Sequence, residues 1–452
     1  MEGTRMRHLN GRVVATEHDS AVPASRRSTI QYTAEGPDRG LVPTHSLHRI
    51  NRVRPKVSSF IRRTFLPTGY PDSVRKEYME YQTWDTIQAL CSYLRGVLST
   101  AAILHASGVG DENASAIAAA VVWVLRDGFG MVGSLMFSYA AASHMDSNIK
   151  AWRLFADVIN DVGMTLDLVA PMFRDHFTLV SSLGTVCKAL CGVAAGCTKT
   201  SITSHFALRA NMADISAKEN AQETAVTLCG MVLGVQVASY LNDSLAVTWA
   251  VFLSLTFLHV YANYRCVSTL HLLTLNKQRA RLLIRAFMTG RHEDMQPERI
   301  SRQERVWAPM LLWFKYKNLG DRLHRMAADE KAFQWLKQTY KDERYLLGLN
   351  QDRSLSVVLH PRASPADMLR AYFQCVVFWD KAVARKDLCV EDVLHHDRCL
   401  ELLVESRDFC QDNFGEFVGL LHGKGWDVDH LLLGFGTWRC EWDVAGGAAK
   451  DE

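Results

Sequence analysis

The distribution of apolar residues divides the chain into a long apolar middle and two charged flanks. Apolar residues concentrate between about 86 and 275. The three longest runs in this part without Asp, Glu, Lys or Arg are 128–145, 224–242 and 244–264. Before these runs, apolar residues recur at helical spacings of three and four, as from Trp84 to Leu94. The pattern predicts a mainly α protein whose helical domain, a bundle rich in Gly and Ala, covers residues 64–288.

The last two runs predict a helical hairpin over residues 224–264. Asn242, Asp243 and Ser244 separate them and have the composition of a turn. The second run has 21 residues, which as a helix would span about 30 Å, the thickness of a bilayer hydrocarbon core. Lys and Arg lie at the open end of the hairpin and not at its turn, as in a membrane hairpin with its turn on the far side.

A buried hairpin in a large soluble helical domain is the alternative interpretation. The two runs contain polar residues that weaken the membrane signal: Gln236, Thr248, Ser254, Thr256 and His259.

A polar segment, residues 211–224, leads into the hairpin. Ser216 and Glu219 have the spacing of a capping box, which predicts a helix that begins near Ser216. Capping does not explain why six further polar residues share this window: Asn211, Asp214, Lys218, Asn220, Gln222 and Glu223. A polar site at the mouth of a helical bundle is the other interpretation of the segment.

Charged residues interrupt the apolar middle at a few places. Arg126 and Asp127 lie between two apolar runs, and Asp157 and Asp161 lie one turn apart on a helix face. In a soluble bundle such groups are solvated or ion-paired, whereas in a membrane bundle they are costly and mark a pathway or a site. The candidate polar site consists of Arg126, Asp127, Asp157, Asp161, Asn211, Asp214, Lys218, Glu219 and Glu223.

No motif for catalysis or metal binding stands out. Gly128, Gly130 and Gly133 spell G-x-G-x-x-G, but an apolar helix precedes them and no alternation of strands and helices follows, which favours close helix packing over nucleotide binding. The 11 cysteines form no C-x-x-C pair and no zinc spacing. The net charge of +3 argues against a nucleic-acid partner. We therefore expect no enzymatic activity, no catalytic residue and no metal, and the cofactor stays unknown.

The two flanks predict different structures. Residues 1–63 hold 12 Lys/Arg against 5 Asp/Glu and lack the apolar core of a secretory signal, which predicts a disordered basic tail or an organellar transit segment. Residues 270–288 have the pattern of a basic amphipathic helix that faces water or headgroups. Residues 289–342 predict a charged linker with short helices, and 343–452 a small α+β domain. In that domain we expect a hairpin over 345–360, a helix that begins at Ser364-Pro365, and a last strand over 431–442.

Several of these segments resemble the root UV-B sensitive (RUS) family, formerly a domain of unknown function. The resemblance rests on motifs in the family's order: 65–78 (FLPTGYPDSVRKEY), 84–89, 123–130, 152–161, 211–224 (NMADISAKENAQET), 263–265 and 270–279. It covers roughly residues 65–285. To our knowledge the family has no established biochemical activity, and in plants it is linked to UV-B response, auxin transport and vitamin B6 status.

The resemblance implies a membrane-associated regulatory or interaction protein with a role in vitamin B6 homeostasis. The partners that we expect are a membrane and other proteins, such as a second RUS-family member. We expect the protein in the membrane of an intracellular organelle, a plastid or a mitochondrion, and not outside the cell. Two alternatives stay open: a transporter-like helical protein that moves a small polar solute, and a soluble helical scaffold.

Overall fold

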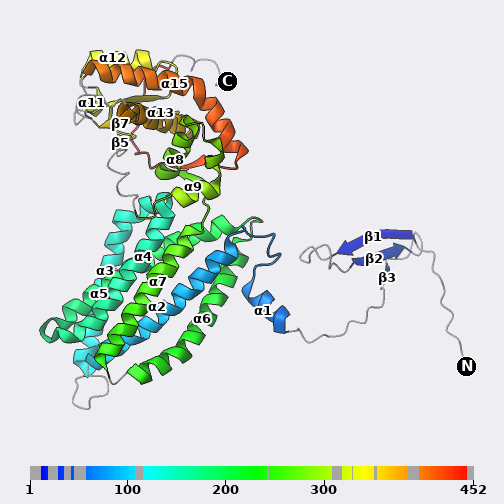
Figure 1. Cartoon of the computed structure of the whole chain (residues 1–452), viewed down its shortest axis with the longest axis vertical. Helices are drawn as coiled ribbons and strands as arrows, with labels where there is room; N and C mark the ends of the chain where they lie inside the picture. Colours follow the sequence, from blue (N-terminus) through cyan, green and yellow to red (C-terminus); the bar gives the residue numbers. More distant parts are fainter. Residues whose placement is uncertain are drawn as a thin grey trace, which may run out of the picture. The chain divides into compact units, whose positions relative to one another are not determined.

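Helices dominate the structure of the chain. The computed structural model describes residues 12–18, 29–34, 42–44, 57–106, 116–241, 244–307, 318–327, 329–350, 354–384 and 396–444. Most of these residues are helical (Figure 1), which confirms the predicted mainly α fold. Their contacts form two compact units, residues 1–78 with 203–228 and residues 79–202 with 229–452. We call them the N-terminal unit and the large unit.

The N-terminal unit begins with a small antiparallel sheet. Its strands pair in the order β1 (Arg12–His18), β2 (Thr29–Ala34) and β3 (Val42–Thr44), and helix α1 (Val57–Phe65) follows. The expectation of a disordered tail over 1–63 missed these strands. The strands are short and lie in a stretch rich in charged residues. They therefore lack the extended apolar pattern by which a strand is predicted from sequence. The alternative of an organellar transit segment stays a prediction.

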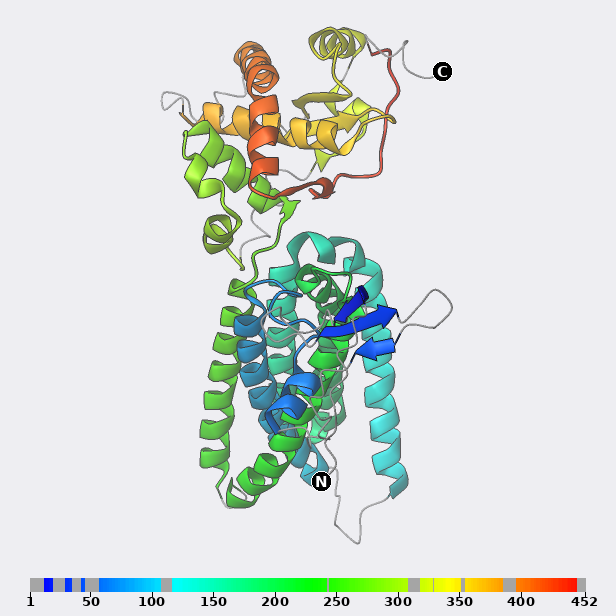
Figure 2. The ribbon, with the colours of Figure 1, turned by 90° about the vertical axis from the view of Figure 1, so that its right-hand side faces the viewer.

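Six long helices form the apolar middle of the chain. They are α2 (Tyr78–Ala106), α3 (Ala116–Met145), α4 (Ile149–Val169), α5 (Phe177–Phe206), α6 (Met212–Leu241) and α7 (Leu245–Ser268). Short 3-10 turns lie between some of them: η2 (Asp146–Asn148), η3 (Ala170–Met172) and η4 (Arg174–His176). Helices α2, α3, α4, α5 and α7 run side by side in both views (Figures 1 and 2). The predicted hairpin corresponds to α6 and α7, and Ser244 caps α7 by accepting from the Val247 N–H.

Small residues let these helices approach closely. A Cβ atom at Gly133 of α3 would lie 2.8 Å from Val186 of α5, and one at Gly163 of α4 would lie 2.8 Å from the carbonyl oxygen of Gly184. Further close approaches involve Gly130, Gly230 and Gly234. The G-x-G-x-x-G pattern therefore contributes two glycines to helix packing.

A second, α+β core lies at the C-terminal end of the large unit. Its helices are α8 (Lys277–Met288), η5 (His292–Met295), α9 (Pro297–Gln303), α11 (Leu323–Met326), α12 (Glu330–Thr339), α13 (Pro365–Ala384) and α15 (His396–Gly423). One sheet has the order β5 (Asn318–Leu319), β7 (Leu355–Leu359), β6 (Tyr345–Leu349), and β4 (Thr274–Asn276) pairs in parallel with β8 (Asp427–Leu432). At the start of α13, Ser364 and Asp367 cap each other's N–H groups, as its sequence predicts. Strand β8 begins four residues before the predicted one.

This C-terminal core takes in residues that the sequence assigned elsewhere. Ile300 and Leu336, from the predicted linker, are buried in it together with Leu283 and Phe287 of α8. The basic helix predicted over 270–288 thus directs its apolar face into a protein core. A composition rich in Arg cannot distinguish a helix on a core from one on headgroups, because both need one apolar face.

Candidate functional site

The structure distributes the nine predicted site residues over several surroundings. Arg126, Asp157 and Asp161 are buried in the helices of the large unit. Asp127, next to Arg126 in sequence, is exposed. Of the remaining residues, Asn211 immediately precedes α6 and the others lie on its first turns. Glu219 is buried, Glu223 is exposed, and three are half-buried: Asn211, Asp214 and Lys218.

Asp157 and Asp161 form the centre of a charged cluster between α2, α4 and α7. They lie one turn apart on α4 and face two polar residues one turn apart on α7. Asp161 accepts from Nδ1 of His259 at 3.0 Å, and Asp157 accepts from the side-chain amide of Asn263. The two helices therefore carry a polar ladder of two rungs between their apolar surfaces.

Two arginines balance most of the charge on this ladder. Nη2 of Arg95, on α2, lies 2.6 Å from Asp161, and its side chain is 0% exposed. Arg153, one turn before Asp157, lies 3.8 Å from it and 3.2 Å from Asp85. We call these residues the central cluster: Asp85, Arg95, Arg153, Asp157, Asp161, His259 and Asn263. Three carboxylates against two guanidinium groups leave an excess of one negative charge when the histidine is neutral.

The α7 side of the central cluster has unused hydrogen-bonding atoms. Among the described residues, Nε2 of His259 and Oδ1 of Asn263 have no partner, although both side chains are 0% exposed. A buried polar atom without a partner costs about 1–3 kcal/mol. Two such atoms one turn apart can therefore accept or donate to a polar ligand.

A second group of charges joins α3, α4 and α5. Asp167 of α4 accepts from Nη2 of Arg126 at 3.2 Å and from Nζ of Lys188 at 2.5 Å. A Cβ atom at Gly184 would lie 2.8 Å from Oδ1 of Asp167, so a glycine is needed there for the carboxylate to keep its position. We call Arg126, Asp167 and Lys188 the Arg126 cluster.

In the N-terminal unit, the polar segment 211–224 binds the main chain at the end of α1 and of the residues that follow it. Nζ of Lys218 donates to the carbonyl oxygen of Arg63 at 2.6 Å, and Nε2 of Gln222 donates to that of Phe65 at 2.6 Å. These are the last carbonyls of α1, which have no partner within their own helix.

Two more residues of the segment continue the same contact. The side chain of Asp214 accepts from the N–H of Thr68 at 2.6 Å, and that of Asn211 donates to the carbonyl oxygen of Ser73 at 3.2 Å. We call Asn211, Asp214, Lys218 and Gln222 with the main chain of residues 63–73 the clamp. It accounts for four of the six polar residues that capping left unexplained.

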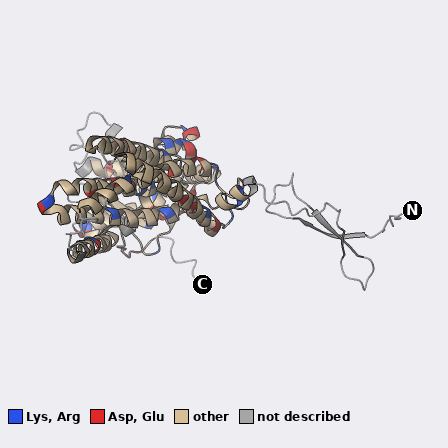
Figure 3. Cartoon of the chain, turned by 90° about the horizontal axis from the view of Figure 1, so that it is seen from below, with Lys and Arg blue, Asp and Glu red and all other residues tan. Residues whose placement is uncertain are grey.

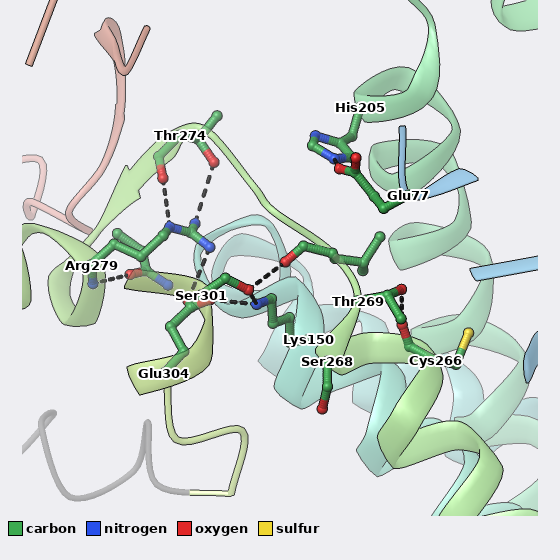
Figure 4. Close-up of polar contacts among 12 residues, drawn as sticks. Glu77, Lys150, His205, Cys266, Ser268, Thr269, Thr274, Arg279, Ser301 and Glu304 are labelled. Carbon is green, nitrogen blue, oxygen red and sulfur yellow. Dashed lines mark hydrogen bonds and ion pairs between the residues drawn. The ribbon is translucent and has the colours of Figure 1, made fainter. Parts of the chain in front are cut away.

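The predicted capping box is wrong. Helix α6 begins at Met212, so Ser216 lies inside the helix, and Glu219 accepts from the hydroxyl of Thr203 at 2.9 Å. The spacing of Ser216 and Glu219 matches a box by chance, because the polar residues of this segment serve contacts outside the helix. His205 in the same unit lies 2.9 Å from Glu77 (Figure 4).

A buried charge triad joins α4 to the α+β core within the large unit. Glu304 lies 2.6 Å from Nζ of Lys150 and 3.0 Å from Nη1 of Arg279, and Lys150 also donates to Ser301 at 2.7 Å (Figure 4). Burial alone would raise the pKa of the Glu304 carboxyl, but the charges of Arg279 and Lys150 outweigh burial and lower it from its ordinary value of 4.5. We call Lys150, Arg279 and Glu304 the junction triad.

Several residues of these clusters were not among the predicted site residues. Arg95 is the one Arg or Lys between residues 77 and 125, and a lone cation in a long apolar helix is a signal that could have revealed it. His259 and Asn263 at i, i+4 mirror Asp157 and Asp161, but a sequence does not tell that α4 and α7 are neighbours. Among the described residues, no group of three or more His, Cys, Asp or Glu is placed to hold a metal ion.

Comparison with known proteins assigns the chain to a family. A family model described as "Vitamin B6 photo-protection and homoeostasis domain" matches residues 51–291, and one described as "Root UVB sensitive protein, C-terminal" matches residues 294–442. The chain belongs to the root UVB sensitive family. This confirms the resemblance found in the sequence motifs.

Two RUS-family relatives align with most of the chain, and a third aligns with about half of it. Protein root UVB sensitive 3 of Arabidopsis thaliana is 37% identical over 418 residues, covering 90% of both chains. Protein root UVB sensitive 2, chloroplastic, of the same plant is 33% identical and covers 85% of this chain and 86% of its own. RUS family member 1 of Dictyostelium discoideum is 47% identical over 245 residues, covering 54% of this chain and 46% of its own. No solved structure matches this chain.

Proposed function

We propose that this RUS-family protein is an integral membrane protein whose helices handle a small polar solute through a charged interior. The observation that supports the proposal is the inverted distribution of its side chains. Apolar side chains point outwards from the long helices, and charged side chains are buried between them. A soluble protein has the opposite arrangement.

The outward faces are apolar over the length of several helices. Exposed side chains include Leu135 at 71%, Val235 at 64% and Phe257 at 77%. In the part of the chain that the structure describes, four helical stretches are long and apolar enough to cross a membrane: Tyr78–Ala106, Ala120–Ala141, Arg174–Phe206 and Leu245–Ser268. Tan residues dominate the helix ribbons in Figure 3, with few blue or red ones. Soluble monomers rarely expose apolar patches larger than a few hundred Å².

The interior of the same helices supports a role in binding or moving a polar molecule. Arg95 and His259 are 0% exposed, and Asp161 lies between them. Ionisable groups within a bilayer are costly, and by default they indicate a site or a pathway. The carboxylates of Asp157 and Asp161 are paired with arginines, which favours binding over acid–base catalysis. We therefore propose a carrier or sensor and not an enzyme.

The family supplies the first solute to test. The family model's description names vitamin B6 photo-protection and homoeostasis, so we propose a vitamin B6 vitamer as the solute. One relative is named chloroplastic, and we propose an organellar membrane as the location. A second RUS-family protein as a partner stays a prediction from the resemblance.

Membrane integration is tested by alkaline carbonate extraction of membranes from cells that express the full chain. Leu253 and Phe257 lie one turn apart on α7 and are 55% and 77% exposed. If α7 is exposed to water, arginines at both positions are solvated, and the variant folds and distributes between pellet and supernatant as the wild type does. In a bilayer they cost roughly 2.5–3.5 kcal/mol each, and the variant leaves the membrane or is degraded. A wild type that extracts freely, with an unaffected double variant, excludes the membrane assignment.

Solute handling is tested by uptake of labelled pyridoxine and labelled pyridoxine 5′-phosphate into proteoliposomes that contain the purified protein. We expect uptake to collapse in Asp161→Asn, because Arg95 loses its counter-charge. Asp127→Asn is the matched control, since Asp127 is exposed and stands next to a buried arginine. Equal uptake by Asp161→Asn and the wild type would exclude the central cluster as the route.

A further inference from the structure

Arg126 is buried but only partly hydrogen-bonded. The residue is 4% exposed, and its Nη2 donates to Asp167 at 3.2 Å. Its Nε and Nη1 atoms are buried and have no partner among the described residues. The guanidinium carbon lies 4.7 Å from the centroid of the Trp123 ring, which holds one face of the plane but offers no acceptor for its N–H groups. Three N–H bonds of a buried cation therefore have no acceptor in the part of the chain that the structure describes.

The surroundings of Arg126 have an excess of positive charge. Asp167 is shared with Lys188, so two cations face one carboxylate. The Asp167 side chain is 3% exposed and that of Lys188 is 33% exposed. The Arg126 cluster thus has a buried end, at the guanidinium, and an accessible end, at the ammonium group. A buried charge that is not fully compensated is unfavourable unless a counter-ion joins it.

We propose that the Arg126 cluster binds a phosphate monoester group. A guanidinium presents paired N–H bonds on its Nε/Nη2 edge and on its Nη1/Nη2 edge, and the second N–H of Nη2, beside the one donated to Asp167, lies on one of these edges. That N–H and its free neighbour on Nε or Nη1 form the fork that binds two phosphate oxygens, and the ammonium of Lys188 can bind the third. A phosphate has three terminal oxygens for these donors, whereas a carboxylate has two. Phosphate also carries more than one negative charge at neutral pH, which compensates the excess charge of the cluster. The inference rests on the proposed function, because it names the group by which the bundle would recognise its solute.

A phosphate monoester can come from a soluble molecule or from a lipid such as phosphatidic acid. The soluble arm of the test uses thermal unfolding of the full chain in detergent, followed by tryptophan fluorescence. Inorganic phosphate, pyridoxine 5′-phosphate and pyridoxine are titrated at constant ionic strength. The lipid arm compares nanodiscs of phosphatidylcholine with and without phosphatidic acid, in phosphate-free buffer.

We expect phosphate and pyridoxine 5′-phosphate to raise Tm in a saturable way, and pyridoxine to leave it unchanged. Arg126→Gln should weaken the apparent affinity about tenfold or more, which corresponds to the loss of one charge-assisted hydrogen bond. Lys188→Met should weaken it less. Arg174→Gln, which removes an exposed cation on η4, should match the wild type. If only phosphatidic acid raises Tm, and Arg126→Gln abolishes the effect, the proposal holds with a lipid as the source.

The proposal is overturned if no phosphate compound raises Tm in a way that depends on Arg126 or Lys188. If Arg126→Gln does not fold, the proposal is tested by the Tm shifts of Lys188→Met and by the comparison of pyridoxine 5′-phosphate with pyridoxine on the wild type. The outcome is separable from that of the proposed function. Uptake that requires Asp161 but ignores Arg126 rejects this site alone, whereas phosphate binding at Arg126 without any uptake rejects the carrier.

Discussion

The junction triad allows a quantitative prediction for Glu304→Gln. The substitution keeps the shape of the side chain and removes its charge, so Lys150 and Arg279 lose the carboxylate that lies 2.6 and 3.0 Å away. Both cations stay buried, at 5% and 2% exposure. Removing one partner of a buried pair costs about 3–5 kcal/mol, because the remaining charge is uncompensated. We expect a loss of that size in the free energy of unfolding.

The assay is urea unfolding of the full chain in detergent, followed by tryptophan fluorescence. Glu293→Gln is the control, because its side chain is 88% exposed and its ion pair with Arg299 is 3.8 Å long. An exposed pair of this kind contributes no more than about 1 kcal/mol. The double variant Lys150→Met with Glu304→Gln should lose less than the sum of the two single losses, since each partner is harmful mainly when the other remains.

The pH dependence has a definite sign. The pKa of Glu304 is lower in the folded protein than its ordinary value of 4.5, so its contribution is present above that value. As the pH falls below 4.5, the contribution is lost progressively, until the folded carboxyl is protonated. The wild type should therefore lose stability more steeply in acid than Glu304→Gln does. A loss below about 0.5 kcal/mol at pH 7, or parallel acid profiles of the two proteins, would refute the account of the junction triad.

Three further predictions concern other parts of the fold. Gly184→Ala should displace Asp167 and lower Tm, because its Cβ would lie 2.8 Å from the carboxylate, and the same change at Gly192, which has nothing within 4 Å, should be neutral. Gln374→Leu should destabilise the α+β core by about 3 kcal/mol or more in urea unfolding, because its buried amide bonds Tyr345, Tyr340, Leu403 and Ser406. Asp214→Ala combined with Lys218→Ala should release residues 63–73 from the clamp, seen as faster trypsin cleavage at Arg63, whereas Asp127→Ala, at an exposed acid of the large unit, should leave the rate unchanged.

The sequence predicted the elements whose information is local. The apolar runs gave α6 and α7 as a hairpin, and the Ser364-Pro365 start of α13 has its capping residues within four positions. The C-terminal hairpin of β6 and β7 likewise has its turn and its apolar pattern in one stretch. These features depend on neighbours in sequence, which a single chain displays.

The sequence could not predict contacts between distant segments. The ladder in the central cluster joins Asp161 to His259, 98 residues away, and no helical spacing shows which helix faces which. The junction triad joins Lys150 to Glu304 over 154 positions, so residues 289–342 read as a linker although they complete a core. The clamp was missed for another reason, since its partners are main-chain atoms, which every sequence has.

The composition of the clamp makes its two sides unequal under mutation. Its donors and acceptors on α6 are side chains, whereas their partners at Arg63, Phe65, Thr68 and Ser73 are carbonyl and N–H groups. A substitution on α6 deletes a bond, but most substitutions opposite it leave every bonding atom in place. Side-chain substitutions that break the clamp directly are therefore confined to Asn211, Asp214, Lys218 and Gln222. On the opposite side only a change of the main chain itself removes a bond, as a proline at Thr68 would by deleting the N–H that Asp214 accepts from.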